Sequence, residues 1–429
     1  MLKDICSKIV VTLRNSNLAK DSFWAVFGSV IGKGLALISG IFIARYLGKE
    51  VYGEYGIIKN TLTYLAIVST FGFGYTATKY VAEYKERDDP QMGWLVHHII
   101  LFTVAFSTLL ALFLFIFAKQ IAIFIEAPEL SCILKKYSII IVFNAIVSTQ
   151  VGVLSGLKLF KINARVNCYT GISLFVLSLL FTYFWGLDGA VFALLMSFLL
   201  QCILNFFCIN DNIKSYSVKA KGTKMEFMSM LSFSLPIALQ EGLYTIVRWI
   251  TIFLLIKYAN YGEVGLSSAA STWAAIVIFI PGMLKNVMFS YLTTAENHNH
   301  LVNRLLLFNL ISTVIPVVVL VAFSKLICSF YGPSFTGLQS VLIISLLSSI
   351  FTSISEVYCY DFISRGYPWI VFFARFLRDV AILLMGWAIL SRVSCNHAMF
   401  LALISLIGGA LFYVVLFFIY RRNSSIIVR

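Results

Sequence analysis

The fold is decided by the stretch Ser22–Tyr80, which reads SFWAVFGSVIGKGLALISGIFIARYL over 22–47, a GKEVY link, and GEYGIIKNTLTYLAIVSTFGFGYTATKY over 53–80. Both long pieces exceed the roughly 20 apolar residues that a helix needs to cross a bilayer. Each carries a lysine well inside the apolar run, Lys33 in the first and Lys59 in the second. A cation at that depth costs at least about 2.5 kcal/mol, so a simple anchor would not contain it. The pair therefore predicts a polar route through lipid.

The composition of the whole chain indicates a polytopic membrane protein. Of its 429 residues, 60% are hydrophobic and 12% are charged, and the mean hydropathy is +0.91. Soluble domains contain about 45–50% apolar and about 25% charged residues. The formal net charge of +14 is not a nucleic-acid signal, because the basic residues of membrane proteins gather in cytoplasmic loops. The eight cysteines are scattered without a CxxC pair and are interpreted as small apolar core residues.

Length and apolarity predict an all-α integral membrane protein with about twelve transmembrane helices. The connections between these helices are short and polar. None of them could hold a separate domain, which excludes an enzyme that needs an extramembrane catalytic domain. The predicted spans cover residues 22–47, 53–80, 94–117, 137–157, 164–185, 189–209, 228–257, 264–293, 301–324, 338–363, 369–390 and 396–420.

The distribution of basic residues predicts that both termini lie in the cytoplasm. With the N-terminus inside, 19 of the 33 Lys and Arg residues fall in cytoplasmic segments and 8 in outer segments, as the positive-inside rule expects. One outer loop, which contains Lys135 and Lys136, runs against this bias. Residues 1–21 carry four basic residues and a helical stripe that begins with Ile5 and Ile9. They are predicted to form an amphipathic helix on the cytoplasmic face.

The chain repeats itself with an offset of 208 to 210 residues. The YGEYG of residues 52–56 corresponds to the YGEVG of residues 261–265, and the Ala-Arg pair at 164–165 corresponds to the pair at 374–375. These matches occur in order and in corresponding spans. The two halves of the chain are therefore predicted to be structural repeats with six spans each.

An even number of spans returns each half to the side from which it started, so the halves are parallel repeats about an axis along the membrane normal. The predicted domains are an N-lobe over 22–209, a basic cytoplasmic linker over 210–227 and a C-lobe over 228–421. Two such lobes form a V-shaped cleft that suits alternating access.

Charged residues inside the predicted spans are the candidate functional groups, because they are costly in lipid. Basic members outnumber acidic ones, so a cleft lined by them is net positive and attracts an anion. The sequence shows no ligand spacing for a metal, no Ser/His/Asp set and no phosphate-binding loop, and neither catalytic residues nor a cofactor is expected. The predicted substrate-binding cations are Lys33, Lys59, Arg248, Lys285, Arg375 and Arg378, and the possible ion-coupling carboxylates are Glu241 and Glu356.

Several charged and kinking residues have structural alternatives. Arg375 and Asp379 are four residues apart on one predicted helix and could form an ion pair with each other. Lys285 lies near the inner end of its span, from which its side chain could reach the interface. Pro236 and Pro281 interrupt the seventh and eighth spans, either as packing kinks or as hinges beside the cleft.

Short motifs along the chain resemble those of bacterial polysaccharide-export proteins. With its twelve spans and two parallel halves, the chain resembles the O-antigen flippases (Wzx-type) of the multidrug/oligosaccharidyl-lipid/polysaccharide exporter superfamily. The motifs are Phe23-Trp24 with Gly28 and Lys33, Ala44-Arg45-Tyr46-Leu47-Gly48, Tyr52-Gly53-Glu54-Tyr55-Gly56, Phe71-Gly72-Phe73-Gly74 and Phe330-Tyr331-Gly332.

The resemblance implies that the chain moves an undecaprenyl-diphosphate-linked O-antigen, or a similar repeat unit, from the cytoplasmic to the periplasmic leaflet of a bacterial inner membrane. It also implies coupling to an ion gradient, a place in lipopolysaccharide biosynthesis, and other polysaccharide-assembly membrane proteins as partners. No nucleic-acid partner is expected. The family theme of cationic residues facing the cleft corresponds here to Lys33, Lys59, Arg248 and Arg375.

Other functions remain open at this point. A multidrug exporter of the same superfamily would expel organic cations and would need a net acidic cleft, against which the cation majority argues. An integral-membrane polysaccharide polymerase or glycosyltransferase would need a sizeable loop or a carboxylate constellation at the membrane edge, and neither is visible. A lipid II flippase would differ only in its cargo.

Overall fold

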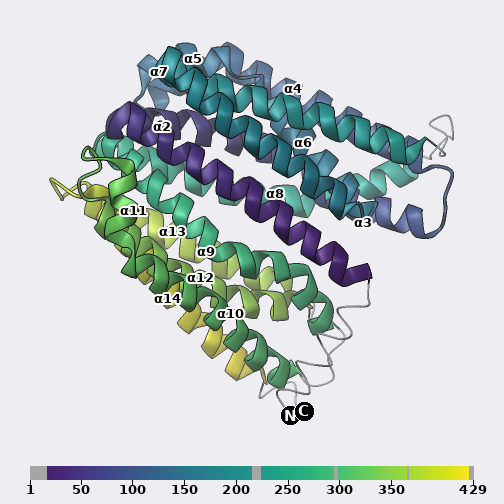
Figure 1. Cartoon of the computed structure of the whole chain (residues 1–429). Helices are drawn as coiled ribbons and strands as arrows, with labels where there is room; N and C mark the ends of the chain where they lie inside the picture. Colours follow the sequence, from purple (N-terminus) through teal and green to yellow (C-terminus); the bar gives the residue numbers. More distant parts are fainter. Residues whose placement is uncertain (1–16, 215–223, 294–297, 365–366, 425–429) are drawn as a thin grey trace. The chain divides into compact units, whose positions relative to one another are not determined.

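The computed structural model describes residues 17–214, 224–293, 298–364 and 367–424 of the chain. Within these ranges the regular secondary structure is helical (Figure 1). The helices are α2 (Asn17–Ser69), α3 (Phe73–Glu86), α4 (Met92–Phe124), η1 (Pro128–Leu130), α5 (Ser131–Lys136), α6 (Ile140–Gly156), α7 (Phe160–Ile213), α8 (Lys224–Tyr258), α9 (Tyr261–Thr293), α10 (His298–Ala322), α11 (Ser324–Tyr331), α12 (Leu338–Ser364), α13 (Pro368–Leu390) and α14 (His397–Ser424).

The lengths of the described helices fit a membrane protein. Seven of them are long and apolar enough to cross a membrane, or eight if α5 and α6, which meet at an angle of 55°, form one broken span. α2 and α7 each contain two successive helical segments, because one glycine in each has a non-helical backbone: Gly48 (φ 78°, ψ 173°) and Gly186 (φ 55°, ψ −129°). Both conformations have a positive φ, which glycine adopts without steric cost. The predicted all-α membrane fold is confirmed.

The second predicted span is not a continuous helix, and this part of the prediction was wrong. α2 ends at Ser69 and α3 starts at Phe73. Between them the backbone takes positive φ at Phe71 (50°) and Gly72 (74°). The hydroxyl group of Ser69 donates to the Ala66 carbonyl at 2.7 Å. Side-chain hydroxyls that bond to nearby carbonyls compete with the helical ladder and favour its end. The apolar pattern alone gave no sign of this break.

The predicted outer loop that runs against the charge bias has neighbours that compensate its lysines. The predicted loop contains the short helices η1 and α5. The ammonium group of Lys136 lies 2.5 Å from a carboxylate oxygen of Asp188. The ammonium group of Lys135 lies 4.7 Å from the ring centroid of Phe115, within the range of a cation–π contact. One of the two charges is thus paired and the other lies over an aromatic ring.

The helices group into two compact units. Unit 1 comprises Met1–Ser39 and Ile58–Ile246, and unit 2 comprises Gly40–Ile57 and Val247–Arg429. The end of the first predicted span therefore belongs to unit 2, and the first part of α8 belongs to unit 1. The predicted lobe boundaries stay a prediction.

Some predicted features fall on residues that the structure does not describe. Most of the predicted amphipathic segment precedes Asn17, and most of the predicted cytoplasmic linker falls within residues 215–223. Pro281 lies inside α9, which continues to Thr293. The side chain of Pro236 in α8 is outside the described set. The roles of both prolines as kinks or hinges stay predictions.

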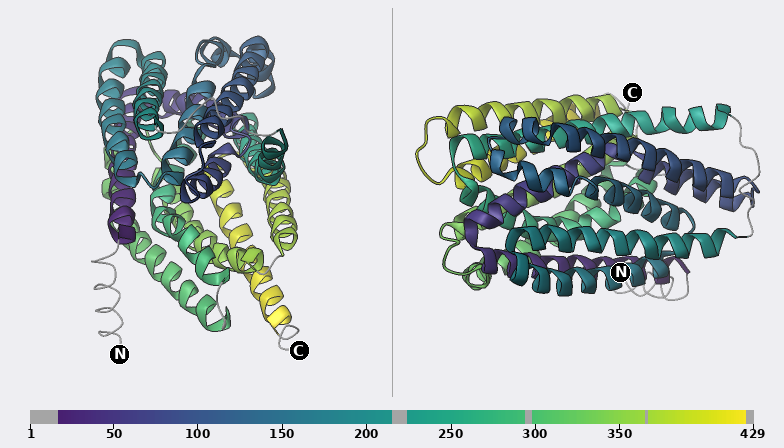
Figure 2. Two further views of the ribbon diagram at one scale, coloured as in Figure 1. Left: turned by 90° about the vertical axis from the view of Figure 1, so that its right-hand side faces the viewer. Right: turned by 90° about the horizontal axis from the view of Figure 1, so that it is seen from above.

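Unit 1 is held together by an apolar core among α3, α4 and α6. The short helix α6 packs on α3, α4 and α7 and lies beside the long helices α4 and α7 in Figure 1 and Figure 2. Buried hydroxyl pairs join the helices. The Oγ1 atoms of Thr103 and Thr149 lie 3.1 Å apart between α4 and α6, and Thr76 Oγ1 and Ser234 Oγ lie 2.6 Å apart between α3 and α8. Such interhelical hydrogen bonds stabilise membrane bundles by about 0.6 kcal/mol each.

Unit 2 has its own core around α12. α12 packs on α9, α10, α13 and α14. A buried cluster joins four of these helices and comprises Val302, Val357, Tyr358, Cys359, Tyr360, Phe362, Val371, Phe412 and Leu416. α12 is therefore the central helix of this unit.

The two repeated YGE motifs pack against each other within unit 2. A Cβ atom on Gly53 would clash with the carbonyl oxygen of Tyr261, and one on Gly265 would lie 2.5 Å from the Lys49 carbonyl oxygen. The Glu50 carboxylate also accepts a hydrogen bond from the Gly262 N–H at 2.8 Å. Small residues that permit such close backbone approach are typical of membrane helix interfaces. The repeat found in the sequence thus corresponds to a helix–helix contact.

Candidate functional site

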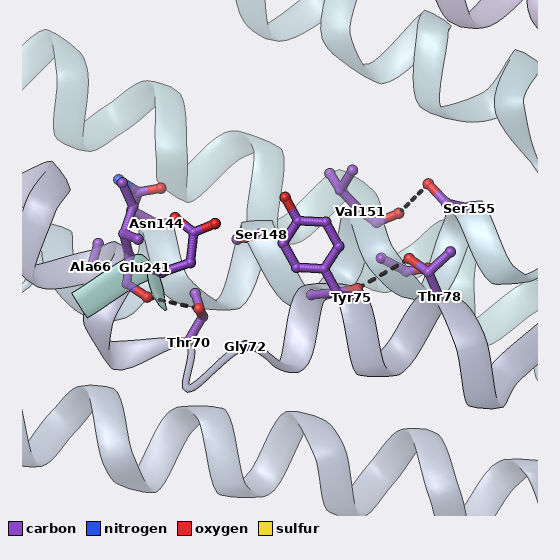
Figure 3. Close-up of a pocket in the computed structure, with 13 residues that line it drawn as sticks. Ala66, Thr70, Gly72, Tyr75, Thr78, Asn144, Ser148, Val151, Ser155 and Glu241 are labelled. Atoms are coloured by element: carbon purple, nitrogen blue, oxygen red, sulfur yellow. Dashed lines mark hydrogen bonds between the residues drawn. The ribbon is translucent and has the colours of Figure 1, made fainter. Parts of the chain in front are cut away.

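Unit 1 contains a cavity of about 320 Å³ at the break between α2 and α3 (Figure 3). α2, α3, α6 and α8 supply its walls. The lining residues are Ala66, Ile67, Thr70, Gly72, Gly74, Tyr75, Thr78, Asn144, Ser148, Val151, Gly152, Ser155 and Glu241. A volume of this size lies at the lower end of the range for small-molecule sites.

Close contact between α3 and α6 shapes one end of the cavity. A Cβ atom on Gly152 would clash with the carbonyl oxygen of Gly74. The Thr78 hydroxyl contacts the carbonyl oxygens of Gly74 at 3.0 Å and Gly152 at 3.1 Å. The two glycines therefore let the helices touch, and the threonine joins them there.

The cavity has a mostly apolar lining with several polar groups, and its charge comes from a carboxylate. Figure 3 shows Asn144, Glu241, Ser148 and Tyr75 following one another along it. Glu241 is the charged member of the lining. A carboxylate beside hydroxyl and amide groups attracts a cation or the hydrogen-bond donors of a polyol, and it repels an anion. Such a cavity favours a cation or a hydroxyl-rich ligand over an anion.

Unit 2 contains a partly buried cluster of four charges on α12 and α13. Nη2 of Arg375 lies 2.8 Å from both carboxylate oxygens of Glu356. Arg378 contacts the Asp379 carboxylate through Nη2 at 2.7 Å and Nε at 2.8 Å. The Arg378 guanidinium also lies over the ring of Phe412, 4.7 Å from its centroid. The four side chains are 16% to 28% exposed. The cluster has no net charge when all four groups are ionised.

The pairing in this cluster differs from the pairing that helical spacing suggests. The i, i+4 alternative placed Arg375 with Asp379, but Arg375 pairs with Glu356 of the neighbouring helix and Asp379 pairs with Arg378. The charged residues also lie on one side of α13. Its large exposed apolar residues form a different face and are Trp369, Phe373, Phe376, Leu377, Leu384 and Trp387. α13 thus separates its charges from its exposed apolar side chains.

The other predicted cations are distributed over both units. Lys59 lies on α2 in unit 1, and Arg248 lies on α8 in unit 2, both with exposed side chains. Lys33 lies on α2 and Lys285 on α9, but the structure does not describe their side chains. The structure brings together Glu356, Arg375 and Arg378 of the predicted set. That the predicted cations share one cavity stays a prediction.

Sequence reasoning missed most of the residues of the unit 1 cavity. It selected Glu241, but not Tyr75, Asn144 or Ser148. Two signals were available in the sequence. Asn144 is, with Gln150, one of two amide side chains in its predicted span, and Gly72 stands in the Phe-Gly-Phe-Gly motif at the helix break. Among the described residues, no group of three or more His, Cys, Asp or Glu side chains could hold a metal ion.

Comparison with solved structures identifies the class of fold. The chain superposes on an inward-facing multidrug resistance MATE family transporter of the MOP superfamily with a TM-score of 0.77 at 14% identity, covering 94% of this chain and 98% of that one. It superposes on the lipid II flippase MurJ in an inward closed conformation with a TM-score of 0.73 at 17% identity, covering 92% and 87%. At these identities the likeness shows the fold. The chain has the fold of MOP-superfamily transporters.

Sequence comparison identifies the family. Residues 18–294 match the family described as Polysaccharide biosynthesis protein, which is more than half of the chain. The chain therefore belongs to that family, and the predicted resemblance to polysaccharide exporters of this superfamily is confirmed. A stretch of 130 residues is 25% identical to the succinoglycan biosynthesis transport protein ExoT of Rhizobium meliloti (strain 1021). This match spans 30% of the chain and only a quarter of that relative's length.

Proposed function

We propose that the chain is a flippase for undecaprenyl-diphosphate-linked O-antigen or similar polysaccharide repeat units. It moves them from the cytoplasmic to the periplasmic leaflet of a bacterial inner membrane by alternating access. Membership of the polysaccharide biosynthesis family carries the proposal. The transporter fold and the relative named as a succinoglycan transport protein support it.

The chemistry of the cargo fits the charged residues. A diphosphate carries about two negative charges, and sugars are too polar to cross hydrocarbon unaided. Arg375 and Arg378 offer planar guanidinium groups that suit phosphate oxygens, and lysines act as point charges. We place Lys33, Lys59, Arg248 and Lys285 in the same role. The cationic side chains hold the head group while the polyprenyl tail stays in lipid.

The proposal includes coupling to an ion gradient through carboxylates. Glu241 lies in a cavity suited to cations, and Glu356 is held by an arginine. A carboxylate that is exposed to one side of the membrane at a time can carry a proton or a metal cation across. Both termini are proposed to lie in the cytoplasm, and polysaccharide-assembly membrane proteins are the proposed partners.

Deletion of the gene in its source bacterium tests the proposal. We expect lipid-linked repeat units to accumulate in the inner leaflet and surface polysaccharide to be lost, and a plasmid copy should restore both. A plasmid copy with Asp211→Asn, which removes an exposed ion pair with Lys214, is the matched control and should complement. Surface polysaccharide at the normal level in the deletion strain, with no lipid-linked intermediate, would refute the proposal.

The acidic cavity of unit 1 favours a second candidate function, the export of organic cations. Its carboxylate and the partly exposed ring of Tyr75 form a pair of groups that would suit such a ligand. Expression in a drug-sensitive host distinguishes the two functions. If the chain exports organic cations, cells that express it should accumulate less ethidium than cells without it. Glu241→Gln should remove this difference. Unchanged ethidium accumulation, together with lost surface polysaccharide in the deletion strain, excludes it.

A further inference from the structure

The ion pair between Arg375 and Glu356 uses only part of the guanidinium. Both contacts, each of 2.8 Å, come from the same nitrogen, Nη2. Nε of Arg375 is buried and has no hydrogen-bond partner. A buried donor without an acceptor is costly. One edge of the guanidinium carries Nε and Nη2, and this edge can bind two oxygens of one anion. Glu356 binds Nη2 only, so the Nε donor on this edge has no hydrogen-bond acceptor.

A second guanidinium lies one helical turn away on the same face of α13. Arg378 is three residues after Arg375, and side chains at this spacing are neighbours. Unlike Arg375, it uses both Nε and Nη2 to bind its carboxylate partner, Asp379. Its guanidinium also lies over the ring of Phe412. Asp379 and Phe412 therefore hold the Arg378 guanidinium in place. Glu356 binds Arg375 through one nitrogen only, so an anion that also binds Nε can compete with Glu356 for it.

We infer that Glu356 is an internal counter-ion that the phosphate group of a polyprenyl diphosphate displaces from Arg375, and that the displaced Glu356 carboxylate takes up one proton. The inference rests on the proposed function and deepens it. It assigns one phosphate contact of the head group to Arg375 and names the group that couples binding to protons.

The exchange balances in charge. Before binding, the Arg375 cation faces the Glu356 anion. Afterwards the cation faces a phosphate oxygen anion through Nε and Nη2, and Glu356 has gained a proton from water to become a neutral carboxylic acid. A carboxylate that loses its partner in a half-buried position is destabilised in its charged form, so protonation follows. Ligand binding therefore requires proton uptake, and proton release from Glu356 favours the return of Arg375 and expulsion of the ligand.

Other titratable and charged groups lie around Glu356 besides Arg375. Those that interact with it include Arg375 of α13 and Cys359 and Tyr360 of its own helix; the Tyr360 hydroxyl also hydrogen-bonds with Glu356, and the Cys359 thiol with Arg375. The side chain of Lys285 on α9 is not described. The other described charged groups of α12 and of the helices packed on it are Asp361 on α12, Arg378 and Asp379 on α13, Arg304 on α10, Lys325 on α11, Glu263 on α9, and Arg421 and Arg422 on α14.

Calorimetry on the purified full chain in detergent tests the exchange with farnesyl diphosphate as the probe. Titrations at pH 7 in two buffers with different ionisation enthalpies measure the protons taken up on binding. We expect about one proton per ligand for the wild type and about none for Glu356→Gln. Glu356→Gln should bind about tenfold more tightly, because the ligand no longer displaces a charged partner.

Further variants separate the exchange from a folding defect. Arg375→Lys should bind at least about tenfold more weakly, because an ammonium group cannot make the bidentate contact. The double variant E356Q/R375Q leaves no unpaired charge behind and should keep the elution volume of the wild type while it loses binding. Asp188→Asn, which breaks the exposed pair with Lys136 in unit 1, should match the wild type in affinity and proton uptake.

Two ligand controls and two outcomes decide the matter. Farnesol should not bind, and inorganic diphosphate should bind more weakly than farnesyl diphosphate; equal affinity for inorganic diphosphate would overturn the assignment to a lipid. Binding of farnesyl diphosphate without proton uptake, or the same proton uptake in Glu356→Gln, would overturn the exchange. Binding and proton uptake are measured on the purified chain and do not depend on the phenotype of the deletion strain. The counter-ion exchange and the proposed flippase function can therefore be refuted separately.

Discussion

Substitution of Gly265 by alanine probes the contact between the two repeated motifs. The Cβ atom of the alanine would lie 2.5 Å from the carbonyl oxygen of Lys49, 3.3 Å from the Gly53 nitrogen and 3.5 Å from the Gly53 Cα atom. All three neighbours are backbone atoms, which cannot rotate away. Since carbon atoms in contact lie about 3.5 Å apart or more, α9 and α2 must separate by roughly 1 Å at this point.

The cost of that separation follows from two opposing effects. Overpacking of a closely packed interior costs about 1–3 kcal/mol. Replacing a helical glycine by alanine gains up to about 1 kcal/mol. Gly34 on α2 supplies the matched control, because nothing lies within 4 Å of a Cβ atom built there. Gly34→Ala should therefore show only the gain in helix propensity and no overpacking cost. Gly265→Ala should be about 1–3 kcal/mol less stable than Gly34→Ala.

Thermal unfolding of the detergent-solubilised protein measures this difference. For a folding unit of 150–250 residues, 1 kcal/mol shifts Tm by about 2–4 °C. We expect the Tm of Gly34→Ala at or slightly above that of the wild type, and that of Gly265→Ala several degrees lower. A Gly265→Ala variant that melts at the same temperature as Gly34→Ala, or above it, would show that the two motifs do not approach as closely as described.

Three further predictions concern the charged residues and the topology. Glu241→Gln should reduce transport about tenfold or more while the protein keeps its amount in the membrane, because the cavity of unit 1 loses its charge; a normal level of surface polysaccharide would argue against a role for this carboxylate. Lys33→Arg should keep most surface polysaccharide, whereas Lys33→Ala and, more severely, Lys33→Glu should lose it; a well-expressed Lys33→Ala strain with normal polysaccharide would show that the lysine does not contact cargo. Reporter fusions after Ile213 and Arg421 should both behave as cytoplasmic, and a periplasmic signal at either would exclude the predicted topology.

The sequence alone determined the class of protein and the positions of most helices. Apolar runs of about 20 residues can be buried in lipid only as helices, so their number and order can be read from the chain. The repeated YGE motifs indicated an internal duplication, and the charges inside apolar runs selected Glu241, Glu356, Arg375 and Arg378 as unusual. Each of these conclusions depends on single residues or on neighbours along the chain.

The tertiary structure decided which of those residues meet. Helical spacing offered Asp379 as the partner of Arg375, but the partner is Glu356, nineteen residues earlier on the helix packed alongside. The break at Gly72 is likewise invisible in the apolar pattern, because lipid selects for apolar side chains whether or not the helix continues. The pattern of apolar residues predicts only which side of a segment contacts lipid or the protein core. The pairing of charges across helices depends on how those helices pack, and that is set by contacts far apart in the chain.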